Sequence, residues 1–76
     1  MWQASGLTRD YPELAEPYNN LAVLRAARGQ LEPAREALET AVRLDPGYAT
    51  ASENLGDIYL RLAAAAYAQE IGRAHV

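Results

Sequence analysis

The sequence predicts an all-α fold of antiparallel helix-turn-helix repeats, an α-solenoid with about one and a half units. The first observation is a period of 34 residues, which separates Pro12 from Pro46 and also Asn20 from Asn54. The second is composition, since alanine, the strongest helix former, supplies sixteen of the 76 residues. The third is the helical spacing of the apolar residues. Repeats of this length stack side by side, and the stack presents a groove instead of a catalytic pocket.

The first helix is predicted over about residues 15–28. Its apolar residues fall mostly three or four positions apart, which places them on one stripe of a helix: Tyr18, Leu21, Ala22 and Leu24. Pro17 suits the first turn, where its missing N–H has no helical partner. Gly29 stands where a helix commonly ends in a left-handed residue, so we expect the chain to turn there.

The second helix is predicted from about Leu31, with Pro33 in its first turn. Its buried face is predicted from spacing at i, i+4 and i+7: Ala34, Leu38 and Ala41. Residues 45–47, Asp-Pro-Gly, end this helix, because the residue before a proline is driven out of helical geometry.

The third helix is predicted from Tyr48 to roughly Arg73. Its apolar side repeats that of the first: Leu55, Gly56, Ile58, Tyr59 and Leu62. Where the first unit turns at Gly29, this one has Ala63 in a run of four alanines. Alanine favours continuing a helix over reversing it, so we expect one long helix here.

The pattern from Tyr18 to Pro46 resembles the tetratricopeptide repeat (TPR) family, whose unit is a helix-turn-helix of about 34 residues. In that family small residues let two antiparallel helices pack closely, and Ala22 and Ala34 match those positions. Leu38 resembles the large apolar residue that fills the space between units, and Pro46 resembles the proline that closes the second helix. The partial second unit keeps the family's most recognisable positions: Leu55, Gly56 and Tyr59.

The sequence departs from the family at Arg25 and Ser52, where an aromatic residue is usual, and these changes suggest looser packing. We predict a dry seam between the first two helices, formed by Tyr18, Leu21, Ala34 and Leu38. The third helix is predicted to dock beside this seam through Leu55 and Tyr59.

The resemblance divides the chain into the end of a preceding repeat at 1–12, a complete TPR unit at 13–47, a partial second TPR unit at 48–70, and residues 71–76. The last segment looks like the translation of a widely used short-read sequencing adapter, so we expect it to be an artefact. We therefore expect a truncated fragment of a TPR-containing protein whose natural gene continues past about Gln69.

Charge and composition exclude several classes of protein. Ten acidic residues face seven arginines and no lysine, giving a net charge of −3, whereas nucleic-acid binding usually requires a basic patch. Without cysteine there is no disulfide framework and no thiolate zinc site. The longest apolar stretch, Leu62 to Ala68, is far shorter than the roughly 20 residues of a membrane span, and no signal peptide is visible. We expect a soluble chain of unknown compartment, with no nucleic acid and no membrane insertion.

The resemblance implies a peptide-binding groove. Related TPR proteins bind extended or helical peptides along the concave side, through the exposed face of each unit's first helix. The matching residues here are Glu16, Asn19, Asn20, Val23 and Ala27 in one unit, and Thr50, Glu53, Asn54, Asp57 and Arg61 in the next. Asn20 and Asn54 carry the most weight, because an asparagine amide both donates and accepts hydrogen bonds and could hold a peptide backbone. The alternative is that asparagine is simply frequent at this place in the repeat.

Some relatives grip a terminal carboxylate with lysines and asparagines, and this chain does not resemble that version. Glu53 and Asp57 would place negative charge where such a clamp is positive or neutral. A neutral or basic peptide is therefore expected. The alternative is that these carboxylates form only a solvated helix face.

Residues that could carry chemistry are sparse. The only histidine, His75, has no second histidine or cysteine near it, and Ser5 and Ser52 have no histidine partner. The glycines are isolated, so no phosphate loop is predicted. We therefore predict no catalytic site, no metal site and no cofactor. Glu39 lies four residues before Arg43, the spacing of a surface ion pair.

The sequence favours a protein-interaction scaffold without intrinsic catalysis. The alternative is the regulatory or substrate-docking repeat region of a larger enzyme. Self-association through unpaired helix faces is a third prediction, because about three repeats are usually needed to bury the apolar faces.

Overall fold

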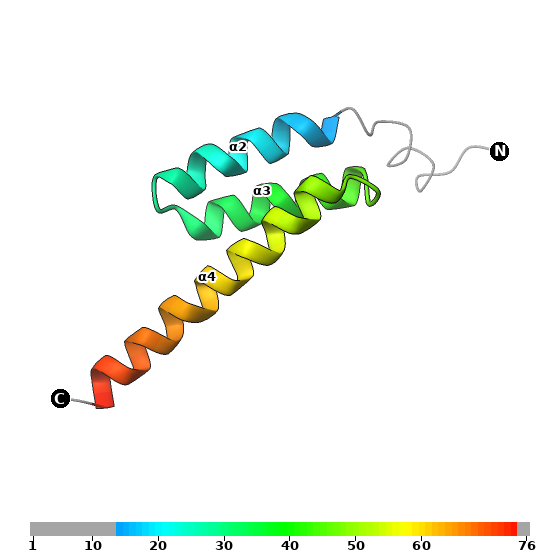
Figure 1. Ribbon diagram of the computed structural model, residues 1–76. Coiled ribbons are helices and arrows are strands. Elements are labelled where there is room, and N and C mark those ends of the chain that lie inside the picture. The colour runs from blue at the N-terminus through cyan, green and yellow to red at the C-terminus, as the bar shows by residue number, and fades with distance from the viewer. Residues whose placement is uncertain (1–13, 75–76) are drawn as a thin grey trace.

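The computed structural model describes residues 14–74, which contain three α-helices (Figure 1). Helix α2 spans Ala15–Ala27, α3 spans Leu31–Leu44 and α4 spans Ala49–Ala74. Helices α2 and α3 form an antiparallel hairpin, and α4 packs mainly against α3. The predicted all-α, helix-turn-helix architecture is confirmed. The predicted end of a preceding repeat, residues 1–12, lies outside the described residues.

The turn between α2 and α3 depends on Gly29, whose φ is +76°. Its N–H donates a hydrogen bond to the carbonyl of Ala26 at 3.0 Å, which closes the last turn of α2. Glycine adopts this left-handed backbone at little cost, whereas a residue with a Cβ is strained there. The predicted turn at Gly29 is confirmed.

The turn between α3 and α4 is built around Asp45, which has non-helical dihedral angles because Pro46 follows it. The carboxylate of Asp45 accepts a hydrogen bond from the N–H of Gly47 at 3.1 Å. Its carbonyl accepts another from the N–H of Tyr48 at 3.0 Å. The aspartate therefore closes the turn from both its side chain and its backbone, and α3 ends where the sequence predicts.

Helix α4 runs without interruption for 26 residues, so the predicted single long helix is confirmed. Its second half extends away from the α2–α3 hairpin, and the molecule measures 61 × 23 × 17 Å (Figure 1). At Ala63 the backbone stays helical, although the equivalent position one period earlier is the turn at Gly29. None of these three helices is both long enough and apolar enough to cross a membrane.

The buried core lies where the three helices meet and consists mainly of alanine. Its buried members are Ala15, Ala22, Ala34, Ala37, Leu38, Ala41, Ala51 and Ile58. Small side chains let helix backbones approach closely, and Leu38 is the largest side chain that is fully buried. The predicted roles of Ala22, Ala34 and Leu38 agree with their burial.

The predicted seam is wrong for Tyr18 and Leu21, which remain 40% and 37% exposed. Tyr59, which was predicted to dock the third helix, is 46% exposed, and its hydroxyl contacts Glu39 of α3. For Leu21 the reason is positional: its equivalent one period later, Leu55, lies on the face of α4 that packs against the core. The same face of α2 has no helix packed on it among residues 14–74. Burial of Leu21 would therefore require a further helix.

Candidate functional site

A groove with a volume of about 280 Å³ lies between α2 and α4. It is lined by Ala22, Val23, Ala26, Ala27, Leu38, Asn54, Asp57, Ile58 and Arg61. Leu38 and Ile58 are buried, whereas Asp57 and Arg61 are exposed, so an apolar floor is bordered by polar groups. A space of this size lies at the lower limit of the volumes usual for ligand pockets.

Helical spacing brings the lining residues together. Val23 and Ala27 lie four positions apart on α2, and Asp57 and Arg61 repeat that spacing one period later on α4. Residues four apart share a helix face, so each helix turns the same face toward the groove. Five of the predicted residues line it: Val23, Ala27, Asn54, Asp57 and Arg61.

The other predicted residues do not line the groove. Glu16, Asn20, Thr50 and Glu53 are exposed to solvent beyond the groove lining. Asn19 was expected on an exposed face and is instead only 5% exposed. Its Oδ1 accepts a hydrogen bond from Nδ2 of Asn54 at 2.9 Å, which satisfies a polar group inside the fold. The asparagine pair therefore joins α2 to α4, and the Nδ2 group of Asn54 already has a partner.

Four further apolar residues of the groove are not among the predicted site residues. Ala22, Ala26, Leu38 and Ile58 line it as well. Ala22 and Ala26 could have been predicted, because they directly precede the predicted residues Val23 and Ala27 on α2.

Two charged residues line the groove, and they have opposite signs. Asp57 and Arg61 form an ion pair at 3.0 Å, and both side chains are about half exposed. The other two predicted carboxylates, Glu16 and Glu53, are exposed outside the lining and, within residues 14–74, take part in no ion pair.

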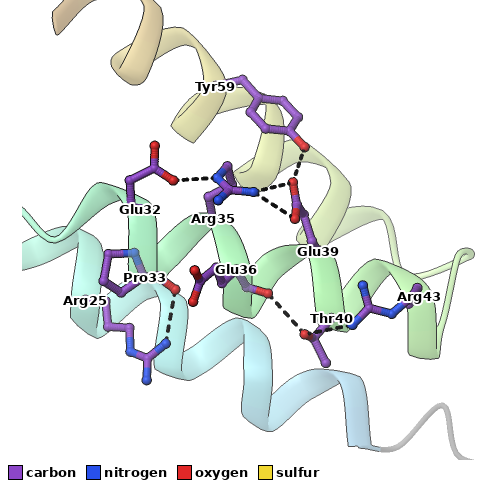
Figure 2. A network of polar contacts seen from close by, with 9 residues as sticks. All are labelled: Arg25, Glu32, Pro33, Arg35, Glu36, Glu39, Thr40, Arg43 and Tyr59. Carbon is purple, nitrogen blue, oxygen red and sulfur yellow. Dashed lines mark hydrogen bonds and ion pairs between the residues drawn. The ribbon is translucent and has the colours of Figure 1, made fainter.

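A separate polar network holds α4 against α3 (Figure 2). Arg35 donates to Glu32 at 2.7 Å and to Glu39 at 2.9 Å, and the hydroxyl of Tyr59 donates to Glu39 at 2.7 Å. Figure 2 shows Tyr59 reaching from α4 to the carboxylate of Glu39 on α3. The network fixes α4 beside α3 and so positions one wall of the groove.

These hydrogen bonds shift the acidity of the groups involved. The hydroxyl of Tyr59 and the guanidinium of Arg35 both donate to the carboxylate of Glu39, and they lower its pKa. The same hydrogen bond raises the pKa of Tyr59, because donation to a carboxylate favours the protonated hydroxyl. Hydrogen bonds to Glu32 and then Glu39 raise the pKa of Arg35.

The predicted ion pair between Glu39 and Arg43 is wrong. Glu39 pairs with Arg35 instead, and Arg43 donates to the hydroxyl of Thr40 at 3.2 Å. Both arginines are within helical reach of Glu39, but Arg35 lies on the side of α3 toward Tyr59, where the carboxylate has a second donor.

Arg25 has a structural role that explains one departure from the expected pattern. Its Nη1 donates to the carbonyl of Pro33 at 3.0 Å, and Figure 2 shows this bond bridging α2 and α3. A guanidinium therefore links the two helices at a position where an aromatic side chain was expected.

No cluster of three or more histidine, cysteine, aspartate or glutamate side chains suited to a metal ion occurs in residues 14–74. His75, the only histidine of the sequence, lies outside the described residues.

Comparison with known proteins points to one family. The TPR repeat profile matches residues 24–62, a little over half of the chain. The chloroplastic tetratricopeptide repeat domain-containing protein PYG7 of Arabidopsis thaliana is 44% identical over 50 residues, which cover 66% of this chain and 17% of that protein. No solved structure matches the chain significantly.

Two further relatives carry the same repeat. Tetratricopeptide repeat protein 8 of Mus musculus is 45% identical over 51 residues, covering 58% of this chain and 10% of that protein. The TPR repeat-containing thioredoxin TTL4 of Arabidopsis thaliana is 50% identical over 52 residues, covering 67% of this chain and 8% of that protein. The chain thus spans less than a fifth of the length of these relatives. With its internal period, its helical hairpin and the profile match, the chain belongs to the tetratricopeptide repeat family.

Proposed function

We propose that this TPR region holds a segment of a partner protein in the groove between α2 and α4, without catalysis by its own residues. The observation that carries the proposal is the groove itself, an apolar floor at Leu38 and Ile58 bordered by Asp57 and Arg61. The groove is formed jointly by the first helices of two successive units. A bound segment would therefore lie across the repeats, with an apolar side chain directed at the floor.

The charges favour a neutral or basic segment. Three candidate groove residues, Glu16, Glu53 and Asp57, are exposed carboxylates, and among the described candidates only Arg61 is basic. Since Arg61 is already paired with Asp57, an incoming carboxylate would meet Glu16 and Glu53 without compensation from that guanidinium. An incoming lysine or arginine would gain attraction from the same two groups.

Isothermal titration calorimetry with three synthetic peptide pools tests this preference. The pools are basic, neutral and acidic, matched in length and in content of apolar residues. We expect the basic pool to bind most tightly and binding to weaken as salt rises, since exposed charges are screened. Tighter binding of the acidic pool would refute the charge preference, and equal lack of heat from all three would refute the groove.

A pair of neighbouring residues offers a matched control for the location. Val23 lines the groove and is 51% exposed, whereas Leu24 lies outside it and is 63% exposed. Val23→Arg is expected to weaken binding of the basic pool at least tenfold, and Leu24→Arg to leave it unchanged. Both substitutions add the same charge to a similarly exposed site. Equal losses of affinity in the two variants would therefore mean that the peptides do not bind in the groove.

A second candidate is that the repeats dock a substrate or regulate a larger enzyme. The relative whose name joins TPR repeats to a thioredoxin favours it. The uninterrupted gene distinguishes the two: further repeats alone would support the scaffold, and an adjoining enzymatic domain would support the docking role.

The division of the chain remains part of this proposal. We propose a complete unit at 13–47 and a partial second unit at 48–70, preceded by the end of another unit at 1–12. We further propose that residues 71–76 derive from a sequencing adapter, which sequencing of the source locus would test. A stop codon directly after Val76 would refute this origin.

A further inference from the structure

The two walls of the groove differ in chemistry. On α2 the lining consists of alanines and Val23, whereas on α4 it includes Asp57 and Arg61. One repeat period relates the charged pair to Val23 and Ala27, so the charge is a feature of the second unit alone. Among the described residues that line the groove, Asp57 is the single carboxylate and Arg61 the single cation. A ligand in the groove would therefore meet carbon on one side and an ion pair on the other.

The ion pair is placed where a ligand can reach it. Arg61 follows Asp57 by four positions, so both side chains lie on the same face of α4, and about half of each is exposed. An exposed pair of this kind contributes little, because water screens the charges and two flexible side chains must be held in place. Another cation could therefore replace the guanidinium at small cost.

A lysine side chain matches this combination of surfaces. Its aliphatic stem can lie along the apolar floor at Leu38 and Ile58, while its ammonium group stays at the exposed rim beside Asp57. The ammonium is a compact charge that one carboxylate can satisfy. Because Glu16 and Glu53 lie outside the lining, Asp57 is the carboxylate that a cation bound in the groove would contact.

We propose that Asp57 recognises a basic side chain of the bound segment by exchange, and that Arg61 competes with the ligand for this carboxylate. In the empty groove, Arg61 takes the place of the ligand's cation. When a lysine enters, its ammonium replaces the guanidinium, which turns to solvent. One exposed ion pair then replaces another, so the natural groove selects basic segments but holds them weakly. This inference rests on the proposed groove function.

Arg61→Gln tests the competition by isothermal titration calorimetry with the basic peptide pool described above. The substitution leaves Asp57 without its partner and removes a like charge from the rim. We expect the basic pool to bind about threefold more tightly at low salt. Arg43→Gln is the matched control, because it removes the same charge from an exposed position on α3 outside the lining. It should change the affinity by less than about 1.5-fold, and equal tightening in both variants would overturn the proposal.

Acetylation of the peptides shows whether the effect depends on the lysine charge. It neutralises the ammonium group and keeps the aliphatic stem. Asp57→Asn should weaken binding of the basic pool about fivefold, because Arg61 then repels the ligand without compensation. Neither this variant nor Arg61→Gln should change binding of the acetylated pool by more than about 1.5-fold. If Arg61→Gln tightened binding of both pools equally, exchange of charges would be refuted.

The exchange also has a direct signal in NMR spectra. The Nε–H resonance of Arg61 can be assigned by its loss in Arg61→Gln. Titration with the tightest-binding basic peptide should move this resonance toward the position of a solvent-exposed arginine, and the acetylated form of that peptide should not. An Arg61 resonance that stays in place when the basic peptide saturates the groove would overturn the exchange.

Failure of this inference can be told apart from failure of the groove itself. If the basic pool gave no heat with the natural chain, the groove proposal and the exchange would both be overturned. If the pool bound, Val23→Arg weakened the binding and Arg61→Gln left it unchanged, the groove would stand and the exchange alone would be overturned.

Discussion

Asn54 donates a hydrogen bond from its Nδ2 to Oδ1 of Asn19 at 2.9 Å, and this bond joins α4 to α2. The two side chains stand 35 residues apart in the sequence, one more than the repeat period. Asn19 is almost fully buried, so its amide is part of the fold. The pair sets the spacing of the two helices that line the groove.

Removing the donor should destabilise the fold. Asn54→Ala leaves the buried Oδ1 of Asn19 without this partner, and we expect a loss of about 1–3 kcal/mol in the free energy of unfolding. Asn20→Ala is the matched control, because it removes an exposed amide from the same helix and should change stability by less than about 0.5 kcal/mol. Urea unfolding followed by far-ultraviolet circular dichroism measures both. Equal effects would contradict a structural role for the pair.

Leu38 anchors the junction of the three helices. It is 1% exposed and is the largest fully buried side chain. Leu38→Ala should therefore cost about 2–5 kcal/mol, since a cavity remains where the side chain was. A domain this small has little more stability than that, so broad, non-cooperative unfolding is the expected result. Leu24→Ala makes the same change at an exposed site and should leave the transition close to that of the natural chain.

The hydrogen bond between Tyr59 and Glu39 gives stability a defined dependence on pH. Glu39 has a pKa below its ordinary 4.5 in the fold, so its contribution is fully present above that value and is lost as pH falls through the lowered pKa. Tyr59 has a pKa above its ordinary 10, so its contribution is fully present below that value and is lost as pH rises through the raised pKa.

Tyr59→Phe tests the pH dependence of stability at both its acidic and its alkaline limit. The pKa of Glu39 should rise toward its ordinary value but stay below it, because Arg35 still donates to the carboxylate. A carbon-detected NMR titration of the Glu39 carboxyl measures this change. The stability difference between the natural chain and the variant should be constant in the neutral range and disappear at both extremes. Tyr67→Phe, at an exposed site, should show no such difference, and a pKa of Glu39 that Tyr59→Phe leaves unmoved would contradict the assigned hydrogen bond.

The helices could be predicted from the sequence because their signals are local. Gly29, Pro46 and the run of alanines from Ala63 each act on the backbone within a few residues. The boundaries of all three helices lie within a few residues of the predicted ones. The burial of Tyr18 and Leu21 was predicted from periodicity and is wrong. Periodicity predicts which residues share a helix face, but not which neighbouring helix covers that face.

The groove could be predicted only in part for a similar reason. Val23, Ala27 and Asp57 follow from the repeat register, which places them on corresponding faces. The partner of Asn54 does not follow from that register, because the period matches Asn54 with Asn20, whereas the hydrogen bond is made to the neighbouring residue Asn19. Whether Glu39 pairs with Arg35 or with Arg43 likewise depends on Tyr59, which lies on another helix.

The hairpin between α2 and α3 should be sensitive to the residue at the turn. Gly29 has φ of +76°, so Gly29→Ala would force a Cβ into the left-handed region at a cost of about 1–2 kcal/mol. Space does not limit this substitution, because the added Cβ would meet no atom within 4 Å. Backbone strain is therefore the only cause of the loss.

Gly47→Ala is the matched control for this strain. Gly47 has no left-handed backbone, and an added Cβ would lie 3.6 Å from Oδ1 of Asp45, an ordinary contact. Its stability should stay the same or rise by about 0.4–1 kcal/mol, because alanine restricts the unfolded chain. Thermal and urea unfolding of the two variants measures the difference. If Gly29→Ala were as stable as Gly47→Ala, the left-handed turn would not be what separates α2 from α3, and the contrast between Gly29 and Ala63 would lose its physical basis.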